Sequence, residues 1–285
     1  MPVKPDAKTK GMGYITHDVI DKFGRLLLAE GSLLTPERVR KLEEQGIQFH
    51  VAAEPLGRKQ GTCGGKQFVF EVPKQLEQKF IRLDLESVAG ASKYLNGVLH
   101  EIKAELSLCS YLKVLAQGHN ATYSHSINVS LISCAIGRKM NLSKPALHEL
   151  ALGALYHDIG TILLPSPVLK AAPDGPAGQN SVYQQHTRLG ADLLAADKFA
   201  KGIFLVAQQH HENYSGTGYP QGIKGGNIHL HAAIAGVANV FDNLTSTGYP
   251  AGLRSPDEAI QEILSGSEII YHPRVVESFV ALFKK

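Results

Sequence analysis

Histidine side chains dominate the residues of this chain that could do chemistry. The chain has 285 residues, of which 13 are histidines. Five of these histidines and one aspartate lie in apolar segments or form adjacent pairs, a pattern that favours a metal site. The set comprises His125, His157, Asp158, His186, His210 and His211. Imidazole together with carboxylate suits iron, zinc, manganese or nickel. Two such ions bridged by a carboxylate would favour hydrolysis of a phosphate ester.

The spacing of this set carries more information than any one member. Adjacent residues of a helix point about 100° apart, so the pairs at 157–158 and 210–211 can serve two ions, or one ion from two directions. For His125 alone, a hydrogen-bonded core histidine is the more common explanation. A His-Asp dipeptide alone is also a weak motif. It is the joint pattern, on at least four predicted helical segments, that predicts a metal centre.

Apolar residues recur at helical spacing from residue 75 onward, which predicts a mainly α fold with a helical domain over residues 75–285. Residues 1–60 are predicted to form a small α/β module, and residues 61–74 a linker rich in Gly and Lys. The module is predicted to contain a hairpin of Tyr14–Ile20 with Arg25–Ala29, a helix from Thr35 to Gly46, a strand at Ile47–Ala52 and a short strand at 68–72. The predicted helical segments are 76–81, 89–102, 106–115, 125–136, 143–160, 183–195, 199–211, 234–244, 256–264 and 275–283.

Composition excludes several classes of protein. The apolar share of 44% is too high for a disordered chain, and a net charge of +3 offers no case for binding DNA. No window has the roughly 18 uninterrupted apolar residues of a membrane span, and the first residues lack the apolar core of a secretory signal. Three cysteines without metal spacing argue against a disulfide scaffold or a zinc ribbon. We therefore expect a cytoplasmic protein.

Six segments, in order and at compatible spacing, resemble the HD-GYP family, a branch of the HD superfamily of metal-dependent phosphohydrolases. The fourth segment contains the Gly-Tyr-Pro run that gives the family its name, and it is the most specific of the six. The segments are Ser124–Val129, Tyr156–Gly160, Gln185–Gly190, His210–Gly225, Val240–Ser246 and Tyr271–Val276.

The resemblance implies an HD-type helical bundle around a binuclear metal centre. It also implies hydrolysis of the bacterial second messenger cyclic di-GMP, to the linear dinucleotide and then to GMP. Iron would be the first choice of metal, with manganese, zinc or nickel as alternatives. Carried over by position, the ligands would be His125, His157, Asp158, His186, His210, His211 and Asn239. Asp158 would bridge the two ions, and Asp158 and Thr161 would occupy catalytic positions. The substrate-binding candidates are Gly218, Tyr219, Pro220, Arg188 and Lys224.

The chain departs from the family pattern at several positions. Thr161 stands where the family has a lysine, and Asn239 where it has a metal-binding aspartate. Ala121 replaces a glutamate that helps to bind a third metal, so we expect two ions rather than three. Several departures remove charged groups around the substrate. They are Ser215, Ala233 and Thr247–Ala251.

Two functions follow from these residues. The first is a phosphodiesterase acting on cyclic di-GMP or a related dinucleotide, with signalling proteins as further partners. The alternative is a divergent, weakly active or inactive member that binds a nucleotide or a partner protein, because two or three lost phosphate contacts would weaken dinucleotide binding by orders of magnitude. A purely structural role for the histidines ranks third. The N-terminal module is interpreted as regulatory, with a simple packing appendage as an equal alternative.

Overall fold

The structure is a computed structural model of the whole chain. It describes residues 13–15, 19–20, 26–28, 33–34, 40, 42, 44, 51–52, 85–104, 111–112, 120–164, 168, 181–246 and 253–283. The chain separates into two compact units. One unit comprises Met1–Phe70 with Leu99–Asn120, and the other Glu71–Val98 with Ala121–Lys285. The linker predicted at 61–74 lies outside the described residues, and the predicted domain boundaries stay predictions.

Short antiparallel strands lie in the first 70 residues, which belong to the first unit. They are β1 (Gly13–Ile15), β2 (Val19–Ile20), β3 (Leu26–Leu28), β4 (Leu33–Leu34) and β5 (Val51–Ala52). Strands β2 and β3 pair as the predicted hairpin. However, β1 belongs to another sheet, of order β4-β1-β5, so the predicted strand Tyr14–Ile20 is divided between two sheets. Within the predicted helix, residues 40, 42 and 44 are helical, and the predicted strand at 68–72 lies outside the described residues.

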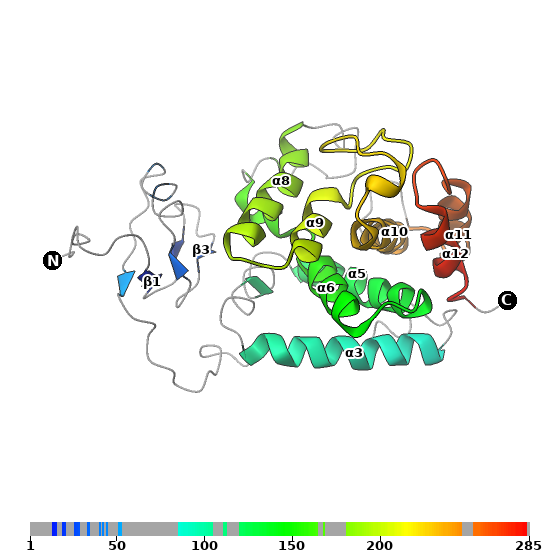
Figure 1. Cartoon of the computed structure of the whole chain (residues 1–285), viewed down its shortest axis with the longest axis horizontal. Helices are drawn as coiled ribbons and strands as arrows, with labels where there is room; N and C mark the ends of the chain where they lie inside the picture. Colours follow the sequence, from blue (N-terminus) through cyan, green and yellow to red (C-terminus); the bar gives the residue numbers. More distant parts are fainter. Residues whose placement is uncertain are drawn as a thin grey trace. The chain divides into compact units, whose positions relative to one another are not determined.

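The second unit is built from helices, as predicted from the periodicity (Figure 1). The described helices are α3 (Leu85–Ala104), α5 (Asn120–Lys139), α6 (Lys144–Leu155), α8 (Ser181–Ala196), α9 (Lys201–Gln209), α10 (Leu230–Thr245), α11 (Pro256–Ser265) and α12 (Pro273–Val280), with the 3₁₀ turns η1 (Ile159–Leu163) and η3 (Gly225–Asn227). Residues 99–104 of α3 and the first residue of α5 are grouped with the first unit. Each predicted segment from 125 onward corresponds to one of these elements. The segment at 89–102 lies within α3, whereas residues 76–81 and most of 106–115 lie outside the described residues.

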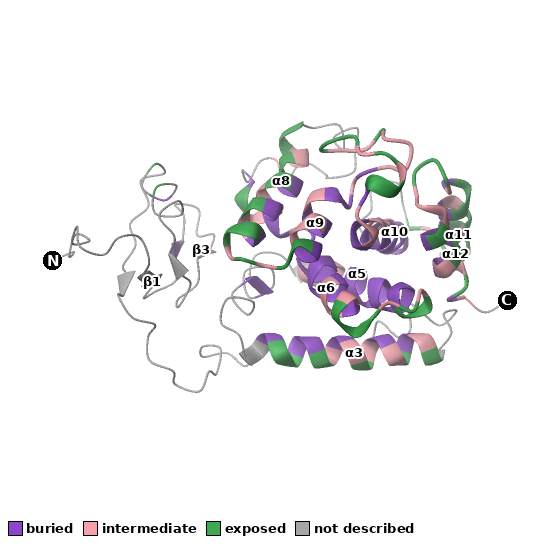
Figure 2. Cartoon of the chain, in the orientation of Figure 1, coloured by how far each residue is buried: buried purple, intermediate pink, exposed green. Residues whose placement is uncertain are grey.

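Helices α5, α6 and α10 are the most deeply buried helices of this unit (Figure 2). Large apolar side chains such as Ile132, Leu150 and Phe241 are almost completely inaccessible to solvent. Burying a side chain of this size contributes about 1.5–3 kcal/mol. These three helices form much of the core, and two of them carry candidate ligands, His125 on α5 and Asn239 on α10.

Helix α6 begins as the sequence predicts but ends earlier than predicted. The hydroxyl of Ser143 accepts a hydrogen bond from the Ala146 amide, and a proline lies in the first turn. The helix ends at Leu155, so the predicted continuation to Gly160 is wrong. His157 and Asp158 instead lie in a turn that leads into η1. This turn frees the two side chains from helical geometry.

None of the described helices combines the length and the hydrophobicity that crossing a lipid bilayer would require.

Candidate metal centre

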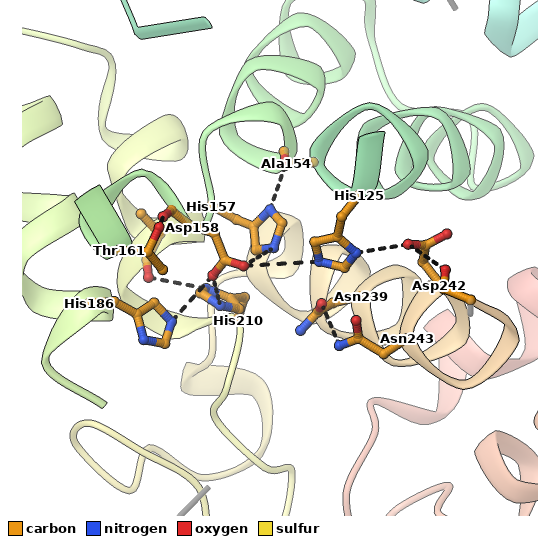
Figure 3. A network of polar contacts seen from close by, with 12 residues as sticks. His125, Ala154, His157, Asp158, Thr161, His186, His210, Asn239, Asp242 and Asn243 are labelled. Atoms are coloured by element: carbon orange, nitrogen blue, oxygen red, sulfur yellow. Dashed lines mark hydrogen bonds and ion pairs between the residues drawn. The ribbon is translucent and has the colours of Figure 1, made fainter. Parts of the chain in front are cut away.

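Elements far apart in the sequence bring five histidines and one aspartate together. Figure 3 shows Asp158 with four of these histidines, namely His125, His157, His186 and His210. His125 lies on α5, and the turn after α6 carries His157 and Asp158. His186 comes from α8, while the pair at 210–211 directly follows α9. All six side chains were candidate ligands in the sequence. The histidines that are spread along the sequence therefore meet at one place in the fold.

Asp158 belongs to two separate groups of candidate ligands. One group holds Asp158 with three histidines, His186, His210 and His211, and the other holds it with His125 and His157. In each group the candidate ligand atoms lie within 4.8 Å of one another. The carboxylate is therefore shared between a four-residue group and a three-residue group.

The two carboxylate oxygens of Asp158 face different groups. Oδ1 lies 3.3 Å from Nε2 of His186 and 3.5 Å from Nε2 of His210. Oδ2 lies 3.2 Å from Nε2 of His157 and 4.0 Å from Nε2 of His125. Two ligands about 2.1 Å from one ion, at ordinary coordination angles, are about 3.0–3.4 Å apart. Three of the four separations are close to this spacing, which is suited to a carboxylate that bridges two ions.

The backbone fixes the orientation of three of the imidazoles. Nδ1 of His157 donates to the Ala154 carbonyl at 2.8 Å, and Nδ1 of His186 donates to the Tyr183 carbonyl at 2.7 Å. Nδ1 of His210 donates to carbonyls of the preceding turn at 3.0 and 3.1 Å. Because a carbonyl only accepts, each Nδ1 carries the proton and each Nε2 keeps a free lone pair. This is the tautomer that a metal-ligating histidine uses.

A carboxylate from α10 orients the fourth imidazole. Oδ2 of Asp242 accepts from Nδ1 of His125 at 2.8 Å, and Oδ1 accepts from Nδ2 of Asn128 at 2.7 Å. Asp242 is only 1% exposed. Burial lowers the pKa of His125, but the hydrogen bond and the charge of Asp242 outweigh it and raise that pKa overall. The arrangement is a carboxylate–histidine pair like those that support metal ligands.

Burial and mutual charge also shift the pKa values of the other groups. Burial lowers the pKa of His186 and lowers that of His210 to about 4. Burial and the neighbouring imidazole of His210 hold the pKa of His211 well below its usual range. Burial alone would raise the pKa of Asp158, but His157 and the other histidines hold it well below its usual range. At neutral pH the four-residue group thus offers three neutral imidazoles, of His186, His210 and His211, and the ionised carboxylate of Asp158, the forms that bind metal.

Four potential metal-donor atoms of the cluster have no hydrogen-bond partner among the described residues. Nε2 of His157, His186 and His210 and Oδ1 of Asp158 are buried and make no hydrogen bond. Leaving one buried polar atom unsatisfied costs about 1–3 kcal/mol, so four at one point need an explanation. Two divalent cations, one in each ligand group, would satisfy all of them. The residues therefore fit the metal that the resemblance implies.

A close approach of two backbones holds the cluster in place. A Cβ atom at Gly160 would overlap the carbonyl oxygen of His186 and the amide nitrogen of Gly190. Glycine at this position allows η1 to pack directly on α8. That contact sets the distance between the turn carrying Asp158 and the helix carrying His186.

The Gly-Tyr-Pro loop lies beside the histidine pair. The ring of Tyr219 stacks on His211, with centroids 4.5 Å apart and an angle of 20° between the rings. The Tyr219 amide donates to the His211 carbonyl at 3.1 Å. Gly218 is in such close contact with the backbone of residues 211–213 that no Cβ would fit. The loop also covers a cavity of about 180 Å³, which His210, His211 and Tyr219 help to line.

The remaining candidates occupy less central positions. Arg188 and Lys224 are exposed, on α8 and on the loop, and Pro220 is exposed as well. The Thr161 hydroxyl donates to the Asp158 carbonyl at 2.7 Å. Asn239 is 4% exposed, and its Oδ1 accepts from Nδ2 of Asn243 at 3.1 Å. The segment 247–251 and the side chain of residue 121 lie outside the described residues.

Sequence reasoning assigned no individual role to two buried carboxylates, Asp242 and Glu212. Asp242 was seen only as part of a family-like segment, although an acid in an otherwise apolar helix is a signal that could have been noticed. Glu212 was named in the sequence only as the residue after His210 and His211, and the structure shows that its Oε1 accepts from the Gln221 amide at 2.8 Å and its Oε2 from the Ile223 amide at 2.9 Å. Nothing in the local sequence distinguishes a buried glutamate that binds a metal from one that accepts hydrogen bonds from a neighbouring loop.

The HD domain family model matches residues 110–275, which is more than half of the chain. A cyclic di-GMP phosphodiesterase of Thermotoga maritima is 28% identical over 214 residues, 74% of this chain and 56% of that protein. The cyclic di-GMP phosphodiesterase response regulator RpfG of Xanthomonas campestris is 24% identical, over 86% of this chain and 64% of that protein. The chain thus spans less than two thirds of either relative. Among solved structures, Bd1817 of Bdellovibrio bacteriovorus is 18% identical with a TM-score of 0.49, over 96% of this chain and 94% of that chain.

The family match includes every candidate ligand described above, from His125 to Asn239. The Gly-Tyr-Pro loop lies within the same matched range. The chain therefore belongs to the HD-domain family.

Proposed function

We propose that this chain is a metal-dependent phosphodiesterase of the HD-GYP type that hydrolyses cyclic di-GMP. The observation that carries the proposal is the position of Asp158, whose two oxygens face two different histidine groups. The relatives in Thermotoga and Xanthomonas, which are cyclic di-GMP phosphodiesterases, support the choice of substrate.

The proposed cofactor is a pair of divalent ions, with iron as the first choice and manganese, zinc or nickel as alternatives. One ion would be held by His186, His210 and His211. The other ion would be held by His125 and His157, and Asp158 would contact both ions. The chemistry that such ions supply when bound is polarisation of the phosphoryl group and activation of water for in-line attack. The ligand spacing and the unsatisfied donor atoms support this assignment.

Backbone and side-chain groups of this chain would prepare the site in three ways. The backbone carbonyls that accept from the Nδ1 atoms hold those protons away from the centre. Asp242 would fix the ring of His125 and compensate positive charge next to it. Gly218, Tyr219 and Pro220 would form the rim against which the dinucleotide lies, with Arg188 and Lys224 as exposed candidates for its phosphates.

A second function remains open, namely a weakly active or inactive member that binds a dinucleotide or a signalling partner. The specific observation that favours it concerns the two substituted positions. Thr161 commits its hydroxyl to the Asp158 carbonyl, and Asn239 commits its amide oxygen to Asn243. A threonine also brings no positive charge toward a phosphate. The two functions differ in turnover and not in metal content.

Hydrolysis of cyclic di-GMP decides between them. The purified chain would be loaded with iron under anaerobic conditions, or with manganese, and its metal content measured before the reaction. Chromatography would follow the loss of cyclic di-GMP and the appearance of the linear dinucleotide and GMP. We expect turnover that disappears on chelation and in Asp158→Asn. Two bound ions without turnover would contradict the enzyme and support the binding module, whereas fast turnover would contradict the binding module.

A further inference from the structure

Glu212 directly follows the candidate ligands His210 and His211 but belongs to neither ligand group among the described residues. Its side chain turns toward the loop and is 8% exposed. One carboxylate oxygen accepts from the Gln221 amide at 2.8 Å and the other from the Ile223 amide at 2.9 Å. A buried carboxylate with a backbone donor on each oxygen is well satisfied. Glu212 therefore binds the loop and does not bind the metal centre.

The two amides lie on the half of the loop that follows the Gly-Tyr-Pro run, which we call the returning half. Between them and Glu212 the chain passes through Tyr219, whose ring stacks on His211 and whose amide donates to the His211 carbonyl. The loop thus begins at the histidine pair and folds back so that Tyr219 contacts His211. The carboxylate of Glu212 holds the residues that follow Tyr219 through the amides of Gln221 and Ile223.

The opposite side of the loop is held by main-chain contacts. The amides of Tyr214 and Ser215 donate to the carbonyls of Ile270 and Ile269, at 3.0 and 2.8 Å. The Gly225 amide donates to the Tyr214 carbonyl at 2.9 Å. These bonds do not depend on any side chain. The returning half, by contrast, depends on a single charged group for the bonds at residues 221 and 223.

We propose that Glu212 is a positioning residue that couples the metal ligands to the substrate rim. It sits next to His211 in the chain and holds the segment that carries Tyr219 and Pro220 at a fixed place over that histidine. The part of this inference that concerns substrate rests on the proposed function. The part that concerns the loop stands without it.

A carboxylate is required for this role, and an amide is not equivalent. In Glu212→Gln one of the two amide donors would face an NH₂ group instead of an acceptor, and the charge that strengthens both bonds would be lost. The side chain keeps its size, so the core around it is not emptied. Glu212→Asp keeps the charge but is one methylene shorter, and it should reach one of the two amides only.

Amide hydrogen exchange measures the coupling directly. In metal-loaded Glu212→Gln we expect the amides of residues 221 and 223 to exchange at least tenfold faster, while those of residues 214 and 215 keep wild-type rates. Metal content should equal that of wild type. Glu277→Gln, an exposed glutamate on α12, should leave all four rates unchanged. If Glu212→Gln fails to fold, Glu212→Asp should show faster exchange at one of the two positions.

Calorimetry with cyclic di-GMP tests whether Glu212 affects substrate binding at the rim formed by Gly218, Tyr219 and Pro220. We expect the dissociation constant to rise at least tenfold in Glu212→Gln, at unchanged metal content. Unchanged exchange at residues 221 and 223 in the folded variant would overturn the proposal, as would loss of metal with both amides still protected. If wild-type protein does not bind cyclic di-GMP, the proposed substrate is wrong, and the exchange experiment still decides whether Glu212 holds the loop.

Discussion

Replacing Asp242 by asparagine should weaken metal binding in the half of the centre that contains His125. Asp242 is buried and accepts from Nδ1 of His125 at 2.8 Å and from Nδ2 of Asn128 at 2.7 Å. The Ser246 hydroxyl lies further from the same carboxylate, at 3.3 Å. An asparagine keeps the shape but loses the charge, and its amide has one acceptor for two donors.

The size of the effect follows from the two short bonds. A hydrogen bond to a charged group contributes about 1.5–3 kcal/mol, and removing a carboxylate behind a metal-ligating histidine typically reduces metal affinity about 10–100-fold. That factor corresponds to about 1.4–2.7 kcal/mol. The four-residue group around His186 makes no described contact with Asp242. We therefore expect one ion to bind 10–100 times more weakly and the other within about threefold of wild type.

Stepwise titration of metal-free protein with manganese, by calorimetry and with the bound metal measured by mass spectrometry, resolves the two ions. Asp192→Asn, the same chemical change at an exposed site on α8, serves as the matched control and should bind both ions normally. Wild-type affinity for both ions in Asp242→Asn would refute the reasoning. Equal weakening of both ions would show that Asp242 supports the whole domain rather than one ligand.

Three further predictions concern catalysis, packing and pH. Thr161→Lys combined with Asn239→Asp restores the charges that the family pattern has, so initial rates on cyclic di-GMP should rise at least tenfold; unchanged rates would mean that these substitutions do not limit turnover. Gly160→Ala places a Cβ against the backbone of α8, so urea denaturation should show a loss of about 1–3 kcal/mol or more, whereas Gly97→Ala, which meets nothing within 4 Å, should gain up to about 1 kcal/mol. Burial, followed by the charge of a neighbouring imidazole, lowers the pKa of His231 to about 4, below its unfolded value of 6.5. The unfolded chain therefore binds an extra proton between these pH values, and the free energy of unfolding should fall as pH drops from about 6.5 toward 4. Equilibrium unfolding of the metal-free protein across this range should have a smaller slope in His231→Asn, and an identical slope would contradict the assignment.

The sequence predicted the helical elements well because their signals are local. The hydroxyl cap at Ser143 and the proline behind it mark the start of α6 by chemistry that involves only neighbouring residues. The end of the same helix was placed too late, because the turn at His157 is stabilised by tertiary contacts. The packing of Gly160 against α8 is one such contact, and the residues next to Gly160 in the sequence do not predict it.

The candidate site was only partly readable from the sequence, for a related reason. Histidine spacing and family-like motifs pointed to the residues that the structure brings together. The roles of Asp242 and Glu212 depend on partners 117 and 9–11 residues away, and on which way a buried side chain turns. Similarly, the resemblance identified Asn239 as a substitution, but only the structure revealed that its oxygen is engaged by Asn243.

A crystal structure with anomalous scattering measured at the iron and manganese edges tests the metal centre most directly. Protein loaded with either metal should give two anomalous peaks, one beside each oxygen of Asp158, with His186, His210 and His211 around one peak and His125 and His157 around the other. A single peak, or peaks away from Asp158 in protein with a known metal content, would contradict the bridging role on which the proposed chemistry rests.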